Sequence, residues 1–197
     1  MINVDAFHAE HRAAGKASAV SLELIEIEEP GRTETQTPAF MLWGLGLRPF
    51  FLLASAFAAL SVPLWVLQFS GVLEHPYLSG PLWHAHELLF GFALAVIVGF
   101  LLTAGRTWSN RPTATGAPLM ALVVLWLTAR VLVLTPWGWA AALVNTAFPV
   151  SAAIALAIPF HAARNRRNYF FVGLLLLIAA AVLTFHLAQL QFLMLPS

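Results

Sequence analysis

The sequence predicts an all-α protein: a polytopic membrane helix bundle with about five transmembrane helices and a polar N-terminal tail. Composition is the first observation, because 60% of the 197 residues are hydrophobic and only 10% are charged. Ordinary soluble domains carry far more charge. The second is a series of five apolar segments, each close to the ~20 residues that cross a ~30 Å hydrocarbon core. The third is the placement of basic residues in alternate connections between these segments, which is typical of multi-pass membrane proteins.

The polar tail covers residues 1–38 and carries seven of the nine acidic residues of the chain. It is not a signal peptide, because an apolar core and a cleavage site are both missing. Within it, residues 22–28 (LELIEIE) partly alternate apolar with acidic side chains. This pattern favours a short strand or a segment that lies against a partner, and a flexible tail is the alternative.

The predicted transmembrane domain covers residues 39–197. Its spans are residues 47–69, 84–105, 117–136, 138–160 and 169–193. Each span is expected to be a helix, because backbone groups in lipid must be hydrogen-bonded internally. The third and fourth helices are joined by only four residues, 135–138 (TPWG), which predicts a tight helical hairpin.

The charges of the connections predict the orientation of the bundle. Basic residues lie in the tail, between the second and third spans and between the fourth and fifth, whereas residues 70–83 and 135–138 contain none. We therefore expect the N-terminus inside the cell and the C-terminus outside. Tryptophan favours membrane interfaces, and it would then lie on the outer side at Trp65, Trp83, Trp137 and Trp139 and on the inner side at Trp43 and Trp108.

Charge and cysteine content exclude several functions. A net charge of +1 without a basic run gives no reason to expect a nucleic-acid partner, so the lipid bilayer is the expected surrounding. The chain contains no cysteine, which excludes disulfides, cysteine-ligated iron–sulfur clusters, thiolate haem and covalent c-type haem. Any haem must be held non-covalently, and the seven histidines are the expected ligands.

The motif at residues 83–87 (WHAHE) brings two imidazoles and a carboxylate to the start of the second span. Ionisable groups in a span are costly and therefore indicate a functional site. A third imidazole, His186, lies in the fifth span, and we take His84, His86 and His186 as candidate metal ligands. Helical geometry places His84 and Glu87 on one face and His86 about 160° away from His84, so a regular helix does not offer both motif histidines to one ion. His86 is also expected at a shallower depth than His186.

Two further features of the spans leave alternatives open. Gly91, Ala95 and Gly99 follow His84 on its helix face, and this small-residue stripe favours either close helix packing or a flat slot for a porphyrin. Arg130 lies in the third span near its outer end; it can snorkel to the interface, pair with Glu87, or bind the propionates of a haem. The cofactor expected from the imidazoles is b-type haem, and copper is also possible because imidazole suits it.

Five runs of residues, in collinear order over about 38–190, carry a family resemblance. They are residues 42–53 (LWGLGLRPFFLL), 83–93 (WHAHELLFGFA), 99–104 (GFLLTA), 164–171 (RNRRNYFF) and 185–187 (FHL). Together they resemble the NnrS family. The resemblance implies a polytopic protein of the bacterial inner membrane, haem and copper as cofactors, and a role in denitrification and in resistance to nitric oxide. In that membrane, the orientation expected from the basic residues puts the N-terminus in the cytoplasm and the C-terminus in the periplasm.

Typical members of that family are longer and have more spans, so this chain resembles their N-terminal half. The expected partners are a second copy of the chain or another membrane protein, with a nitric oxide reductase as the candidate. The leading hypothesis is a haem-binding accessory subunit of nitric oxide metabolism that is not an enzyme by itself. The alternatives are a cofactor-free structural subunit of a respiratory complex and, least favoured, conversion of nitric oxide within this chain.

Overall fold

The computed structural model describes residues 42–73, 77–78 and 80–194, and within these residues all regular structure is helical. The predicted tail, residues 1–38, lies outside the described part. The helices are α3 (Leu47–Phe69), α4 (Gly80–His86), the π-helix η1 (Glu87–Ala93), α5 (Leu94–Ser109), α6 (Ala117–Val133), α7 (Gly138–Ala162), the 3₁₀ turn η2 (Arg166–Asn168) and α8 (Tyr169–Met194). The predicted all-α class is confirmed.

The helices correspond one to one with the predicted spans, because α4, η1 and α5 form one continuous helix. Four helices are long and apolar enough to cross a membrane, and α6 is shorter, with 17 residues. The second helix begins at Gly80, four residues before the predicted start, and the third ends at Val133, three residues before its predicted end. Pro136 explains the earlier end, because proline disfavours helical geometry in the residue before it.

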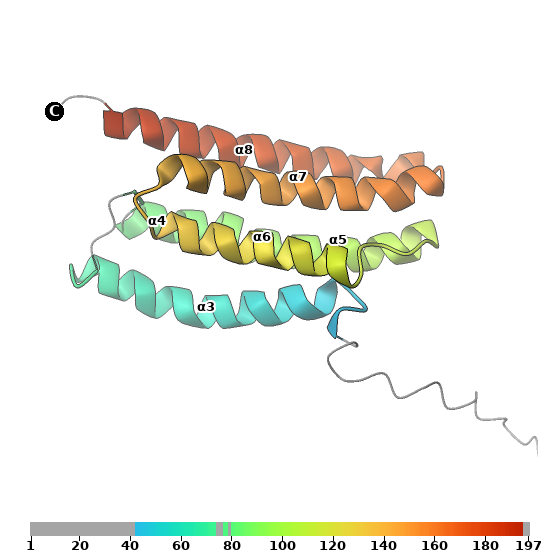
Figure 1. Ribbon diagram of the computed structural model, residues 1–197, viewed down its shortest axis with the longest axis horizontal. Coiled ribbons are helices and arrows are strands. Elements are labelled where there is room, and N and C mark those ends of the chain that lie inside the picture. The colour runs from blue at the N-terminus through green and yellow to red at the C-terminus, as the bar shows by residue number, and fades with distance from the viewer. Residues whose placement is uncertain (1–41, 74–76, 79, 195–197) are drawn as a thin grey trace, which may run out of the picture. The chain divides into compact units, whose positions relative to one another are not determined.

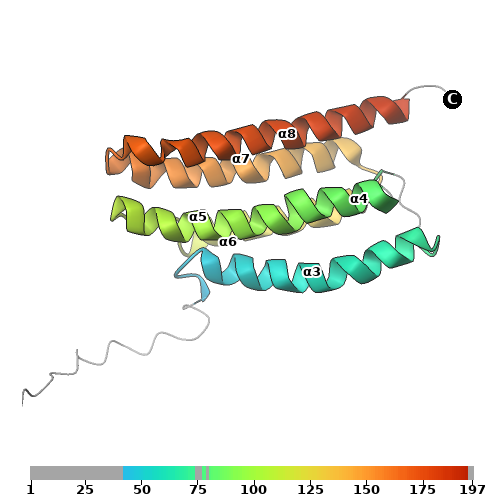
Figure 2. The ribbon, with the colours of Figure 1, turned by 180° about the vertical axis from the view of Figure 1, so that it is seen from behind.

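Successive helices run antiparallel and pack side by side (Figures 1 and 2). α7 packs on α8, on α6 and on α5, while α3 packs on the continuous helix formed by α4, η1 and α5. In Figure 1 α6 lies in front of α5, and Figure 2 shows the same pair from behind. The bundle therefore has two ends, at which the connections lie.

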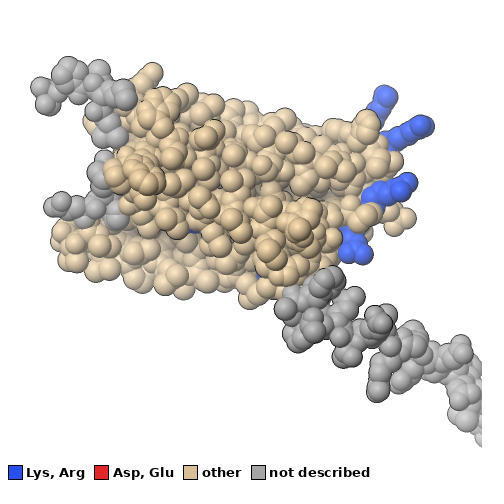
Figure 3. Space-filling model, viewed as in Figure 1, with Lys and Arg blue, Asp and Glu red and all other residues tan. Residues whose placement is uncertain are grey.

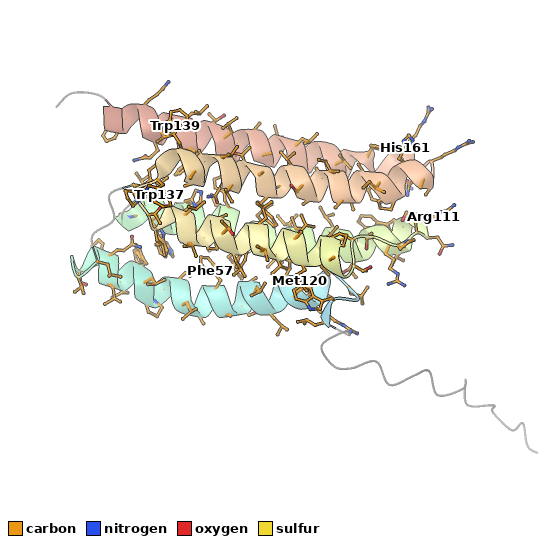
Figure 4. The ribbon with its side chains drawn as sticks, viewed as in Figure 1. Phe57, Arg111, Met120, Trp137, Trp139 and His161 are labelled. Atoms are coloured by element: carbon orange, nitrogen blue, oxygen red, sulfur yellow. The ribbon has the colours of Figure 1, made fainter. Side chains whose placement is uncertain are left out.

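The two ends differ in chemistry. α3, α6 and α8 begin, and α5 and α7 end, at what we call the arginine end; Figure 3 shows the basic side chains gathered there. Arg111 and His161 lie at this end in Figure 4, and Trp137 and Trp139 lie at the opposite, tryptophan end. Large apolar side chains cover the sides, among them Leu60, which is 63% exposed. Apolar flanks, with the exposed charges of the described residues gathered at one end, are consistent with contact with a lipid bilayer.

Two apolar clusters fill the interior, and a polar layer separates them. The larger cluster includes Leu94, Trp126 and Phe148, and the smaller one, toward the tryptophan end, includes Trp83, Val133, Ala142 and Leu190. Five buried polar or charged residues from four helices fall at the boundary between these clusters. They are His86, Glu87, Arg130, Asn145 and His186.

Candidate functional site

The centre of the polar layer is a pair of imidazoles from the second and last long helices. His86 ends α4 and His186 lies in α8, and they are 1% and 0% exposed. Their Nε2 atoms lie 3.2 Å apart, and the two rings cross at 70°. The structure thus brings together two of the three histidines predicted from the sequence as metal ligands. Each directs its Nε2 atom at the other.

The outer nitrogen of each ring has its own partner. Nδ1 of His86 lies 2.8 Å from Oε1 of Glu87, and Nδ1 of His186 lies 2.5 Å from the hydroxyl of Tyr77. Tyr77 stands in the connection between α3 and α4 and is 4% exposed; burial raises its pKa to about 12. The phenol is therefore neutral at physiological pH, and it can either donate to or accept from the imidazole.

A buried ion pair continues the layer across the bundle. Nη1 of Arg130, in α6, donates to Oε2 of Glu87 at 2.7 Å, and Nη2 donates to the side-chain oxygen of Asn145, in α7. Asn145 in turn donates to the Ala141 carbonyl at 2.9 Å. Glu87 is the one acidic residue within the described residues, so the buried guanidinium depends on it for charge compensation. Of the alternatives for Arg130, the structure places it against Glu87.

A π-helical turn explains how Glu87 reaches both His86 and Arg130. Glu87 is the first residue of η1, the wider turn inserted between α4 and α5. Such turns inside α-helices are frequent at functional sites. The indole N–H of Trp126 donates to the Gly91 carbonyl within this turn at 3.0 Å. A Cβ on Gly91 would lie 2.6 Å from Nη1 of Arg130, so glycine at this position leaves room for the ion pair.

The early start of α4 removes the expected difference in depth. His86 is six residues from Gly80, and His186 is eight residues from Met194. At 1.5 Å per residue these correspond to about 9 Å and about 12 Å from the helix ends. The early start gives His86 the deeper register that was needed for the two imidazoles to meet at a common level.

His84 points away from the pair, as the predicted helical geometry requires. Its ring stacks on Trp65 of α3, with ring centroids 4.6 Å apart. It lines a cavity of about 110 Å³ together with residues of α3, α4 and η1: Ala58, Ser61, Val62, Leu88 and Phe92. His161 is exposed at the arginine end (Figure 4), and His75 lies outside the described residues. Neither His84 nor His161 joins the polar layer.

The small-residue stripe packs helices closely. Gly91 faces Arg130 and Phe57, and a Cβ on Gly99 would lie 2.8 Å from Cβ of Phe50. Ala95 is fully buried. The space beside these residues is filled by α3 and by the Arg130 side chain, which supports the packing alternative for this stripe.

Tyr77 is the part of the site that sequence reasoning missed. It lies in a connection, six residues before Trp83, and no periodic pattern marks it. Its contact with His186 spans 109 residues, so only tertiary structure could reveal it. Among the described residues, no group of three or more histidine or acidic side chains is arranged to hold a metal ion; the site offers two imidazole nitrogens.

Comparison with known proteins adds one family. The family described as NnrS protein matches residues 41–196, which is most of the chain and includes the whole polar layer. No curated protein and no solved structure matches the chain significantly.

Proposed function

We propose that this chain, which belongs to the NnrS family, holds a metal ion between His86 and His186. Membership of that family suggests a protein related to the nitric oxide response. The proposal includes an accessory role in nitric oxide metabolism and denitrification. The observation that carries it is the 3.2 Å approach of two Nε2 atoms, whose Nδ1 atoms are both engaged elsewhere. Metal-bound histidines usually have the other ring nitrogen held in this way by a carboxylate or another polar partner.

The distance between the imidazoles suits a bare ion. Metal–imidazole bonds are about 2.0–2.1 Å long, and two of them meeting at a tetrahedral angle separate the nitrogens by about 3.3 Å. Copper is the ion favoured by two imidazoles in a site without cysteine. When bound, it would supply one-electron redox chemistry and open coordination positions to which nitric oxide can bind. The chain itself would orient the two rings and exclude water.

Haem does not fit between the same two nitrogens. A porphyrin iron with two axial imidazoles needs them about 4 Å apart with a flat ring between them. Here Phe90 and Phe185 pack on the His86 ring, with centroids 5.3 Å and 5.2 Å away. The cavity beside His84, at about 110 Å³, is also below the 300–1,000 Å³ of ordinary cofactor pockets. Neither the histidine pair nor the cavity beside His84 therefore fits a haem.

One observation favours a second function, that of a cofactor-free structural subunit. The polar layer can satisfy itself with neutral rings: Tyr77 donates to Nδ1 of His186, Nε2–H of His186 donates to Nε2 of His86, and Nδ1–H of His86 donates to Glu87. Metal binding instead needs the other tautomer of His186, with Nδ1–H donating to Tyr77. The tautomer of His186 thus separates the two functions.

The proposal also covers location and partners. We propose that the arginine end faces the cytoplasm of a bacterial inner membrane, since basic residues favour that side. The exposed arginines at that end, Arg106, Arg111, Arg164, Arg166 and Arg167, support this orientation. A second copy of the chain or a larger membrane enzyme would be its partner.

The test is metal analysis of the purified full chain, expressed with copper and haem supply, together with absorption spectra of its oxidised and reduced forms. We expect about one copper ion per chain, which is lost in both His86→Ala and His186→Ala. His84→Ala is the matched control, because this ring lies on the same helix but outside the pair, and it should retain the metal. Copper retained by the double variant His86→Ala/His186→Ala overturns the site. A metal-free, folded protein without a haem spectrum supports the structural subunit instead.

A further inference from the structure

The arginine end carries a concentration of positive charge, and no acidic side chain among the described residues lies at this end. Five arginines there are exposed, and their guanidinium groups make no hydrogen bond or ion pair with another described residue: Arg106, Arg111, Arg164, Arg166 and Arg167. Glu87, the acidic residue in the described ranges, is 1% exposed and lies in the polar layer. The helix termini here thus present a basic surface that no acidic residue of the described ranges compensates (Figure 3).

One part of this surface is hollowed into a pocket. It has a volume of about 720 Å³ and is lined by residues from the end of α5, the connection between α7 and α8, and the start of α8: Trp108, Asn165, Arg167, Asn168, Phe170 and Phe171. A second hollow, of about 410 Å³, lies beside the same connection between α7 and α8. It is lined by His161, Arg164, Arg166 and Tyr169. The loop between α7 and α8 therefore directs arginines to both of its sides.

A hydrogen bond and a stacked pair of rings hold the residues that line the pocket. The Asn165 side chain donates to the Trp108 carbonyl at 2.9 Å and ties the loop to the end of α5. The Trp108 indole stacks on Phe171, with ring centroids 4.9 Å apart and an interplanar angle of 20°. Phe170 beside them is 70% exposed. A guanidinium and two amide side chains thus stand next to an aromatic surface at the end of the apolar flank.

This combination matches one kind of ligand. An anionic phospholipid presents a phosphate and polar glycerol groups next to acyl chains, and basic pockets between transmembrane helices bind such headgroups. The pocket volume lies within the range of ordinary small-molecule sites and exceeds what a simple inorganic ion needs. Tryptophan and its aromatic neighbours suit the membrane interface, where the headgroup and the chains meet.

We propose that the pocket lined by Trp108, Asn165, Arg167 and Asn168 binds the headgroup of an anionic phospholipid, with the acyl chains along Phe170. Arg167 pairs with the phosphate, and the amides of Asn165 and Asn168 bond to its oxygens or to the glycerol hydroxyls. The lipid bridges the ends of α5 and α8. This site lies at the opposite end of the helices from Tyr77 and does not depend on metal binding.

The test titrates the detergent-solubilised full chain with phosphatidylglycerol and, separately, with neutral phosphatidylcholine, and counts bound lipids by native mass spectrometry. We expect Arg167→Gln to weaken phosphatidylglycerol binding by about fivefold or more, the effect of one interfacial arginine. Arg111→Gln is the matched control: it removes the same charge at the same end but lies outside the pocket, and it should change binding less than twofold. Asn168→Ala should also weaken binding, although it leaves the charge unchanged.

Other results overturn the proposal. If Arg167→Gln and Arg111→Gln weaken binding equally and Asn168→Ala has no effect, the arginines act only as diffuse charge. If inorganic phosphate displaces phosphatidylglycerol at equal concentration, the pocket is a free-phosphate site and not a lipid site. Equal binding of phosphatidylcholine excludes recognition of an anionic headgroup. Unchanged thermal unfolding of each variant establishes that the differences arise at the pocket.

Discussion

The Nε2 atoms of His86 and His186 lie 3.2 Å apart although 100 residues separate the two histidines in the chain. Each ring is held from behind, His86 by Glu87 and His186 by Tyr77. Glu87 is itself held by Arg130, and Arg130 by Asn145. The position of the histidine pair thus depends on side chains from four helices and one connection, and each link can be tested separately.

Replacing Tyr77 by phenylalanine distinguishes the metal site from the structural subunit. If His186 binds copper through Nε2, the loss of its Nδ1 partner should weaken copper affinity by about 10–100-fold. If the layer holds no metal, the variant leaves a buried acceptor unpaired and lowers the free energy of unfolding by about 1–3 kcal/mol. Copper titration and chemical denaturation measure the two effects. Tyr169→Phe, at the arginine end, is the control and should change neither.

The Glu87–Arg130 pair should show strong coupling. Glu87→Gln alone leaves a buried guanidinium without its counter-charge, and Arg130→Met alone leaves a buried carboxylate; either change should lower the free energy of unfolding by about 3–5 kcal/mol. The double variant Glu87→Gln/Arg130→Met removes both charges. It should lower the free energy of unfolding by much less than the sum of the two single changes. Reversible denaturation in mild detergent measures the free energy of unfolding of the wild type, the two single variants and the double variant. Additivity to within about 0.5 kcal/mol would mean that the two side chains do not interact.

Gly91 should tolerate no side chain, because a Cβ there would meet the Arg130 guanidinium at 2.6 Å. The guanidinium is fixed by Glu87 and Asn145, so it cannot move without loss of those bonds. Gly91→Ala should lower the free energy of unfolding by about 1–3 kcal/mol, as overpacking does. Gly173→Ala is the matched control: it is also a helical glycine, no atom lies within 4 Å of its added Cβ, and it should be neutral or stabilising by up to about 1 kcal/mol. Equal effects of the two substitutions would contradict the close approach at Gly91.

Tyr77 should make stability fall at high pH. Its pKa is raised by burial from 10.0 to about 12 in the folded chain. Above pH 10 the phenol ionises in the unfolded chain but stays protonated in the folded one, so the unfolded state gains stability as pH rises from 10 toward 12. Denaturation curves at pH 9, 10, 11 and 12 should show this decline in the wild type and a smaller decline in Tyr77→Phe. Parallel declines in both proteins would assign the effect to other groups.

Much of the fold followed from local properties of the chain. Long apolar segments must form helices in lipid, so the five helices and the start of α3 at the predicted Leu47 needed no tertiary information. The opposite directions of His84 and His86 likewise followed from helical geometry and are confirmed by their contacts with Trp65 and His186. The family resemblance was also present in short collinear runs and is confirmed over residues 41–196.

Other features depended on the three-dimensional packing. The start of α4 at Gly80 and the π-helical turn at Glu87 decide the depth of His86 and the direction of the carboxylate, and periodicity cannot detect a single wider turn. Tyr77 reaches His186 because Tyr77 packs against α8, in one apolar cluster with Leu190.

The sequence by itself determined a bundle of apolar helices with ionisable residues inside it, because hydrophobicity and helical periodicity are properties of neighbouring residues. Only the tertiary structure decided which of these residues meet. A buried charge in an apolar interior is stable only beside its partner, and the partners of Glu87, Arg130 and His186 come from different helices, whose packing brings them together.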